Sequence, residues 1–226
     1  MSMIALRDVT KTYQVSKEVA VTAVRGVSLN VERGEFVIIT GRSGSGKTTL
    51  LNLAAGLVKP TSGEVRLADV NLWSLSDREQ SLLRNQKIGF VFQFPSLLPS
   101  LTVLENVALP TMFATNHKNR DAYERAARLL EVVGLSDKLS AYPRQLSAGQ
   151  QQRVVVARAL ISQPQVLLAD EPTSNLDEQT EQEIMNLFRD IHGQTGITII
   201  LVTHTSQLVA YGTRAIAMAN GAILDA

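Results

Sequence analysis

Residues 41–49 carry the side chains of this chain that are best suited to chemistry. They read Gly-Arg-Ser-Gly-Ser-Gly-Lys-Thr-Thr and fit the pattern G-x-x-x-x-G-K-[ST]. Glycines allow the backbone to curl so that successive N–H groups point inward, which makes a cradle for phosphate oxygens. In this pattern Lys47 reaches the β- and γ-phosphates of a nucleotide, and the Thr48 hydroxyl binds Mg²⁺. The residues expected to contact the nucleotide are Gly41, Ser43, Gly44, Ser45, Gly46, Lys47, Thr48 and Thr49.

An ordinary Gly-Ser turn is the alternative explanation of this stretch. With glycine at about 7% of residues, a chance match in a chain of this length has a probability of about one per cent or less. The flanks also favour a phosphate loop, because residues 36–40 are an apolar run typical of a strand and residues 50–55 begin a helical pattern. A helix that starts near Lys47 directs the positive end of its dipole at a bound anion.

Apolar segments of strand length alternate with helical segments along the rest of the chain. Polar residues follow several of these strands, and the carboxyl ends of parallel strands meet at one edge of a sheet. The pattern therefore predicts an α/β protein with a mostly parallel sheet, interrupted by a mostly helical insert. Strands are expected at residues 4–13, 27–38, 64–67, 88–92, 166–169 and 197–202, with a closing Asn-Gly hairpin over 214–224. Helices are expected at residues 50–57, 76–86, 121–133, 147–161 and 178–192.

The composition limits which partners the protein can bind and which cellular compartment suits it. The 22 Lys and Arg residues nearly balance the 21 Asp and Glu residues, so no basic field indicates a nucleic-acid partner. The absence of cysteine excludes disulfides and suits a reducing compartment. The longest apolar runs are far below the ~20 residues that a membrane helix needs, and the first residues do not resemble a signal peptide. We expect a cytoplasmic protein that has no nucleic-acid partner and reaches a membrane only through another protein.

Residues 146–153 are the second informative stretch and read Leu-Ser-Ala-Gly-Gln-Gln-Gln-Arg. Ser147 and Gln150 stand in the S-x-x-Q relation of a capping box, which predicts the start of a helix. A helix start that offers a serine hydroxyl and the N–H of Gly149 is also suited to an anion. Here the sequence resembles the ATPase subunits of ABC transporters, whose signature usually reads LSGGQ.

The resemblance extends to further motifs, which appear along the chain in the family's order. Asp170 and Glu171, behind the apolar run 166–169, resemble the residues that hold Mg²⁺ and orient the attacking water; an isolated pair would more simply be two solvated acids. Gln93 matches the glutamine that contacts Mg²⁺ and the attacking water, and His204 matches the histidine that contacts the γ-phosphate. Asp177 matches a loop at the dimer interface. Tyr13 matches the aromatic residue that stacks on adenine, although alone it would be read as a packing residue.

The resemblance covers the whole chain and implies one ABC ATPase cassette, residues 1–226. Residues 1–93 and 164–226 would form a P-loop NTPase core with an N-terminal antiparallel β subdomain, and residues 94–163 a helical subdomain. Three passages, over residues 21–29, 92–99 and 104–110, narrow the likeness to the branch of lipoprotein-releasing and macrolide-exporting ATPases.

The implied function is ATP hydrolysis by a homodimer. Each ATP would lie between residues 41–49 of one copy and residues 147–150 of the other, and closure would drive an integral membrane permease, placing the protein peripherally on the inner face of the cell membrane. Two alternatives stay open, a non-transport ABC ATPase of the DNA-repair or translation type and a regulatory or cell-division factor. The former is disfavoured by the absence of room for a long coiled coil and by the near-zero charge.

Three positions depart from the family pattern. Ala148 replaces the first signature glycine, Ser174 stands where this branch often has glycine, and Thr205 follows the switch histidine where aspartate is common. The first two changes replace one small residue by another. The last raises the question of what positions the loop around His204. The remaining histidines, His117 and His192, are expected to be solvated.

Overall fold

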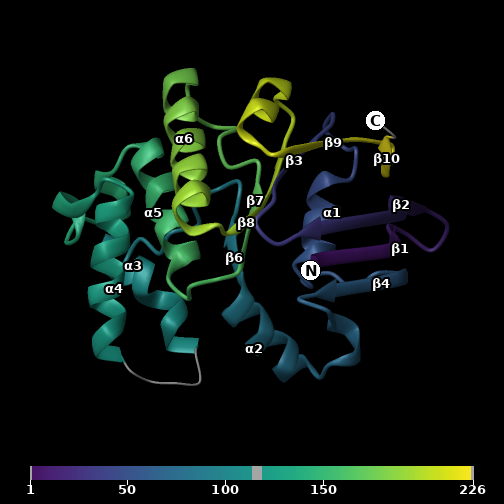
Figure 1. Cartoon of the computed structure of the whole chain (residues 1–226), viewed down its shortest axis with the longest axis horizontal. Helices are drawn as coiled ribbons and strands as arrows, with labels where there is room; N and C mark the ends of the chain where they lie inside the picture. The colour runs from purple at the N-terminus through teal and green to yellow at the C-terminus, as the bar shows by residue number, and fades with distance from the viewer. Residues whose placement is uncertain (1, 114–118, 225–226) are drawn as a thin grey trace.

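A six-stranded sheet, parallel except at one edge, forms the centre of the molecule (Figure 1). The structure, a computed structural model, describes residues 2–113 and 119–224. The strand order is β10-β9-β3-β8-β7-β6, and only β10 runs antiparallel to its neighbour among these described strands. The predicted fold class is confirmed. The strands are β3 Phe36–Thr40, β6 Ile88–Val91, β7 Val166–Asp170, β8 Thr198–Thr203, β9 Arg214–Ala219 and β10 Ala222–Leu224.

The strands β3, β7 and β8 are buried on both faces because alternate side chains enter different cores. In β3, Phe36 and Ile38 pack with the helical side of the molecule, whereas Val37 and Ile39 pack with the antiparallel sheet. Two-sided burial explains why these strands read as unbroken apolar runs in the sequence. Because β3, β8 and β7 are parallel neighbours, their C-terminal ends lie at one rim, where their following loops meet.

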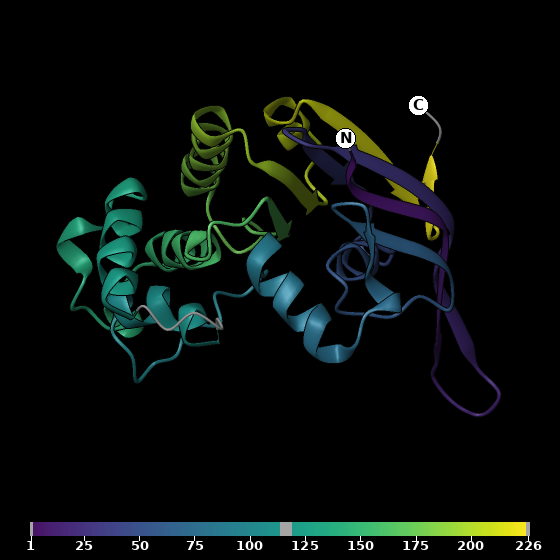
Figure 2. The ribbon, with the colours of Figure 1, turned by 60° about the horizontal axis from the view of Figure 1, so that its bottom comes forward.

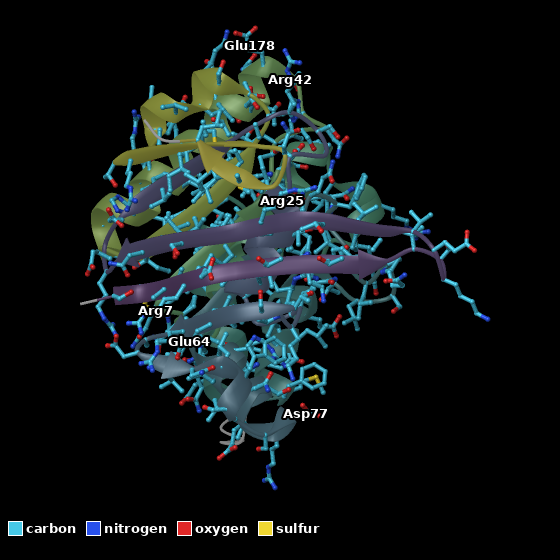
Figure 3. All side chains as sticks on the ribbon, turned by 90° about the vertical axis from the view of Figure 1, so that its right-hand side faces the viewer. Arg7, Arg25, Arg42, Glu64, Asp77 and Glu178 are labelled. Carbon is cyan, nitrogen blue, oxygen red and sulfur yellow. The ribbon has the colours of Figure 1, made fainter. Side chains whose placement is uncertain are left out.

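The N-terminal strands form a separate antiparallel sheet of order β2-β1-β4-β5. Its strands are β1 Ser2–Gln14, β2 Ala20–Glu32, β4 Ser62–Leu67 and β5 Val70–Asn71. β2 begins seven residues before the expected strand start at 27, because its first part pairs with the end of β1 in a long hairpin. Figure 2 shows the turn of this hairpin projecting from the body. In Figure 3 this sheet faces the viewer, and Arg7 on β1 lies beside Glu64 on β4, with Nη1 and Oε2 3.4 Å apart.

The helices α3 to α6 gather on the side of the parallel sheet away from the antiparallel sheet, and α1 packs between the two sheets (Figure 1). α4 ends one residue before the predicted 133, and Gly134 follows with φ +75°, as a C-terminal cap requires. The helices are α1 Lys47–Ala54, α2 Asp77–Lys87, α3 Val103–Ala108, α4 Asn119–Val132, α5 Ala148–Leu160 and α6 Glu178–Thr195. No helix of the described residues is long and apolar enough to cross a membrane.

His192 differs from the solvated side chain that we expected. Its Nε2 lies 2.9 Å from the carbonyl oxygen of Gly34, and its ring packs at 5.6 Å from that of Phe36. The last turns of α6 are thus tied to the turn before β3, which brings together two segments that are 158 residues apart in the chain. His117 lies outside the described residues.

Candidate active site

The phosphate loop leaves β3 and enters α1, which begins at Lys47. Gly46 caps this helix with φ +101°, and a methyl group on it would overlap the carbonyl oxygen of Ala23. Only glycine meets both conditions without strain. The loop lines a cavity of about 340 Å³ together with Ala23, Gln93 and Glu171. The structure therefore holds the loop next to two of the residues predicted to be catalytic.

Lys47 is the cation of this cavity and is 4% exposed. Its Nζ donates hydrogen bonds to the carbonyl oxygens of Gly41 at 2.8 Å and Arg42 at 3.2 Å. The same nitrogen lies 3.6 Å from Oε1 of Glu171. A buried ammonium requires such partners, and they hold its charge at the mouth of the loop, where an anion can reach it.

The loop contains a buried hydroxyl that makes no hydrogen bond with the described residues. Ser45 is 5% exposed, and its Oγ has no hydrogen-bond partner among the described residues. A buried hydroxyl without a partner costs free energy, so its presence beside a glycine-rich cradle fits a ligand that supplies acceptor oxygens. A phosphate group has this chemistry. The cradle therefore fits a nucleotide phosphate.

Asp170 and Thr48 bring two hard oxygen ligands together. Thr48 Oγ1 donates a hydrogen bond to Asp170 Oδ1 at 3.0 Å, which joins the start of α1 to the end of β7. Burial raises the pKa of Asp170, and the negative charge of Glu171 acts in the same direction, against the hydrogen bond from Thr48. A cation bound beside Asp170 would instead favour the ionised form of its carboxylate. A hydroxyl and a carboxylate beside a phosphate cradle fit Mg²⁺, which commonly takes few protein ligands and completes its shell with phosphates and water.

The carboxylate of Glu171 lies between two basic groups. His204 Nδ1 lies 2.9 Å from Oε2, and Lys47 approaches Oε1 from the other side. The backbone of Glu171 has φ +43°, which is unusual for a residue with a side chain, and its N–H donates to the carbonyl oxygen of Val202 at 2.9 Å. This conformation directs the carboxylate into the cavity. A second hollow, of about 650 Å³, lies on the His204 side of Glu171.

Gln93 is exposed at the edge of the same cavity, just beyond the end of β6. Its Nε2 donates to Ser174 Oγ at 3.3 Å, a contact that the sequence did not predict although Ser174 was noted as a departure. A glycine at 174 would offer no hydroxyl. The structure thus ties Gln93 to the loop that follows Glu171.

Thr203 helps to position the loop around His204, in which Thr205 stands where the family commonly has aspartate. Thr203 is buried at the end of β8, and its Oγ1 accepts a hydrogen bond from the N–H of Thr205 at 3.0 Å. The loop around His204 is therefore held by a hydroxyl from the preceding strand. Sequence reasoning missed Thr203, because a threonine at the end of an apolar strand is usually explained by β propensity.

The other residues predicted to bind the nucleotide do not line this cavity. Ser147 caps α5: its Oγ accepts from the N–H of Gln150 at 3.2 Å, and Gln150 Oε1 accepts from the N–H of Ser147 at 3.0 Å, so the predicted capping box is present. Asp177 caps α6, and Tyr13 is 39% exposed on β1, with Lys11 Nζ 5.0 Å from its ring centre. The described lining of the 340 Å³ cavity includes none of these residues, nor Gly149.

The chain is similar in sequence to known ATP-binding proteins of ABC transporters. A family model described as ABC transporter matches residues 24–174. An uncharacterized ABC transporter ATP-binding protein of Thermotoga maritima is 49% identical over 96% of this chain and 92% of its own length. The lipoprotein-releasing system ATP-binding protein LolD of Geobacter metallireducens is 42% identical over 99% and 98%.

A longer relative and a solved structure are also similar. The macrolide export ATP-binding/permease protein MacB of Rhodopirellula baltica is 45% identical over 99% of this chain, which spans 33% of that relative's length. The cassette MJ0796, in a dimeric post-hydrolysis state bound to ADP and Pi, superposes with a TM-score of 0.90 at 42% identity, covering 99% of this chain and 97% of that one. The organism of MJ0796 is Methanocaldococcus jannaschii.

Proposed function

The chain belongs to the ABC transporter family, and from that premise we propose that it binds and hydrolyses ATP to drive a separate export-type membrane permease. The observation that carries this proposal is the Glu171 carboxylate, held between Lys47 and His204 at the mouth of the phosphate loop. A charged base beside a phosphate cradle suits hydrolysis, whereas a nucleotide-binding module without catalysis would not need it.

Each side chain of this group has a distinct role in the proposed reaction. Lys47 would bind the negative terminal phosphates, and Glu171 would accept a hydrogen bond from the attacking water and orient it. His204 would hold the Glu171 carboxylate and contact the γ-phosphate. The water oxygen bonds to the γ-phosphorus, and the bond to the leaving ADP oxygen breaks. One proton of the water stays on the transferred oxygen, and the other passes to a second oxygen of the released phosphate. Mg²⁺, held by Thr48, Asp170 and Gln93, would neutralise charge on the phosphate oxygens.

A homodimer is part of the proposal because the predicted anion-binding segment, residues 147–150, does not line the cavity of its own chain. The start of α5 offers backbone N–H groups to an anion, and a second copy would bring one. We propose that ATP binding closes two copies around two nucleotides, with Tyr13 stacked on the base and Asp177 at the interface. The related cassette MJ0796 forms dimers.

The permease would dock on the proposed helical subdomain, residues 94–163, beside Gln93. A groove of about 470 Å³ lies there between α5, β6 and the segment after α3. Of the apolar residues after Gln93, Phe94 and Leu98 are exposed, whereas Leu97 packs against the core. Phe113 adds a side chain that is 72% exposed. Exposed apolar side chains around a groove suit the end of a permease helix, which would place the protein on the inner face of the cell membrane.

Glu171→Gln tests the catalytic part of the proposal. The amide keeps the size and shape of the side chain but removes the negative charge, so ATP should still bind while hydrolysis falls by at least about a hundredfold. The trapped complex should elute as an ATP-dependent dimer on size exclusion. Glu124→Gln, on the exposed surface of α4, is the control and should behave as the unmodified protein. Unchanged turnover in Glu171→Gln would refute the assigned role.

The transport part needs a membrane partner. A permease should co-purify from detergent-solubilised membranes of the source cell, and a Phe94→Ser, Phe113→Ser double variant should recover less of it. Val15→Ser, at a 67% exposed position on the distant hairpin, is the control. Equal recovery by all three proteins would argue against docking at this groove.

A further inference from the structure

Gly149 was predicted to contact the nucleotide of a second copy, and Asp177 to lie at the dimer interface. Within one chain the two are joined by Thr180, a residue outside all the predicted motifs. We propose that Thr180 is a positioning residue that locks the start of α5 to the loop before α6, so that residues 147–150 and Asp177 move as one unit. The proposal rests on the proposed function for its catalytic consequence. Its structural part stands on contacts within the chain.

The polar side of Thr180 is fully used by Asp177. The N–H of Thr180 donates to Asp177 Oδ1 at 2.9 Å, and its Oγ1 donates to Oδ2 at 2.7 Å. These hydrogen bonds hold the pKa of Asp177 below its ordinary value. With both oxygens of the carboxylate engaged, the Thr180 side chain has one orientation, and its methyl group must point away from Asp177.

The apolar side of Thr180 faces Gly149. A methyl group built on Gly149 would overlap Cγ2 of Thr180, and within the described residues the other two nearest atoms to it also belong to Thr180. Gly149 lies in the first turn of α5 and does not have positive φ. The glycine is therefore required by close packing against α6, and its backbone conformation would accept any residue.

A second polar contact joins the same two helices, and a third fixes the loop before α6. Arg153 Nη2 lies 3.0 Å from Glu183 Oε2 in a half-exposed pair, which contributes little rigidity. Thr173 Oγ1 donates to Glu181 Oε1 at 2.6 Å and fixes the loop before α6 to the helix itself. Thr180 is the residue that connects this fixed loop to the start of α5.

This packing offers a second explanation for the glycine of the signature. A methyl group at 149 could block the phosphate of a second copy, as the family resemblance implies, or it could push α5 away from α6 within one chain. The two explanations differ in what a change at Thr180 should do. Thr180→Ser removes Cγ2 and keeps the hydroxyl, whereas Thr180→Val keeps the methyl group and removes the hydroxyl.

The test is a set of five proteins: Gly149→Ala, Thr180→Ser, Thr180→Val and the two double variants. Gly149→Ala should lower Tm and reduce kcat for ATP hydrolysis by at least about tenfold. Adding Thr180→Ser should restore Tm and at least half of the kcat of Thr180→Ser alone, whereas adding Thr180→Val should restore neither. If Gly149→Ala does not fold, the double variant with Thr180→Ser should still yield folded protein, whereas the double variant with Thr180→Val should not. That outcome supports the proposal in the same way. A double variant with serine that stays as impaired as Gly149→Ala overturns the proposal.

Thr180→Val alone tests the link to Asp177. Because the phosphate loop is untouched, KM for ATP should stay within about twofold while kcat falls by about threefold or more. A rise in KM with unchanged kcat would overturn the positioning role. If the unmodified protein hydrolyses no ATP, the proposed function fails, and rescue of Tm by serine still decides whether Thr180 and Gly149 lock the two helices.

Discussion

His204 Nδ1 lies 2.9 Å from Oε2 of Glu171, although the two residues follow different strands and are 33 positions apart. The pairing arises because β7 and β8 are parallel neighbours, so their C-terminal ends lie side by side. Glu171 then turns its side chain toward β8 through its unusual φ of +43°. His204 thus contacts the proposed base directly. Its contact with a bound nucleotide would be a second, separate contact.

This contact predicts the effect of His204→Ala. The change removes a partner of Glu171 and leaves the phosphate loop intact, so kcat should fall by about tenfold or more while ATP affinity changes by less than about threefold. Steady-state kinetics and nucleotide titration measure the two quantities. A loss of affinity equal to the loss of kcat would mean that His204 mainly binds the nucleotide.

Lys47→Ala should weaken ATP more than ADP. The variant loses the ammonium that lies beside Glu171, while the backbone N–H groups of the loop remain. Titration with each nucleotide should show a sharp loss for ATP and a smaller one for ADP. Lys17→Ala, in the exposed hairpin turn, is the matched control. Equal small losses for both nucleotides would show that Lys47 does not face the terminal phosphate.

Asp170→Asn should raise Tm in the absence of Mg²⁺ and nucleotide. The pKa of Asp170 is raised by burial, so ionisation costs stability as pH rises from the ordinary pKa of aspartate through the raised value. The gain in Tm should therefore be present at neutral pH and disappear in acid, where Asp170 is protonated in both the folded and unfolded states. A variant less stable than the unmodified protein at neutral pH would contradict this. The same variant should lose Mg²⁺-dependent ATP binding.

Asp137→Asn is the control, because the pKa of Asp137 is shifted in the direction opposite to that of Asp170. A hydrogen bond from Lys138 holds the pKa of this exposed carboxylate below its ordinary value. Its small contribution to stability is present above that ordinary pKa and is lost in acid. Tm of Asp137→Asn should therefore stay equal or fall slightly at neutral pH.

Ala148→Gly should change steady-state ATP hydrolysis by no more than about threefold. α5 begins at Ala148 with Ser147 as its cap, so position 148 is helical, as we predicted, and favours alanine over glycine by up to about 1 kcal/mol. The departure from the family signature is then conformationally harmless. A tenfold gain in activity would instead identify this chain as a weakly hydrolysing or regulatory cassette.

Features that depend on a few neighbouring residues can be predicted from the sequence alone. The phosphate loop, the capping box at Ser147 and the turn at Asn220 and Gly221 are local, since each is set by glycine conformation or by hydrogen bonds within a few positions. The apolar runs likewise predicted a parallel sheet, because strands buried on both faces need no polar alternation. The roles of the individual site residues remain predictions that the experiments above test.

Contacts between groups that are distant in the sequence follow from the three-dimensional arrangement of the strands and helices. The Lys47–Glu171 and Gln93–Ser174 contacts join segments 124 and 81 positions apart, and they depend on strand order and on the backbone conformation of Glu171. The packing of Gly149 against Thr180 gives no sequence signal, because a glycine needed for close approach looks the same as one needed for a ligand. Side-chain contacts between helices are set by how the helices pack on the sheet, which local propensities do not encode.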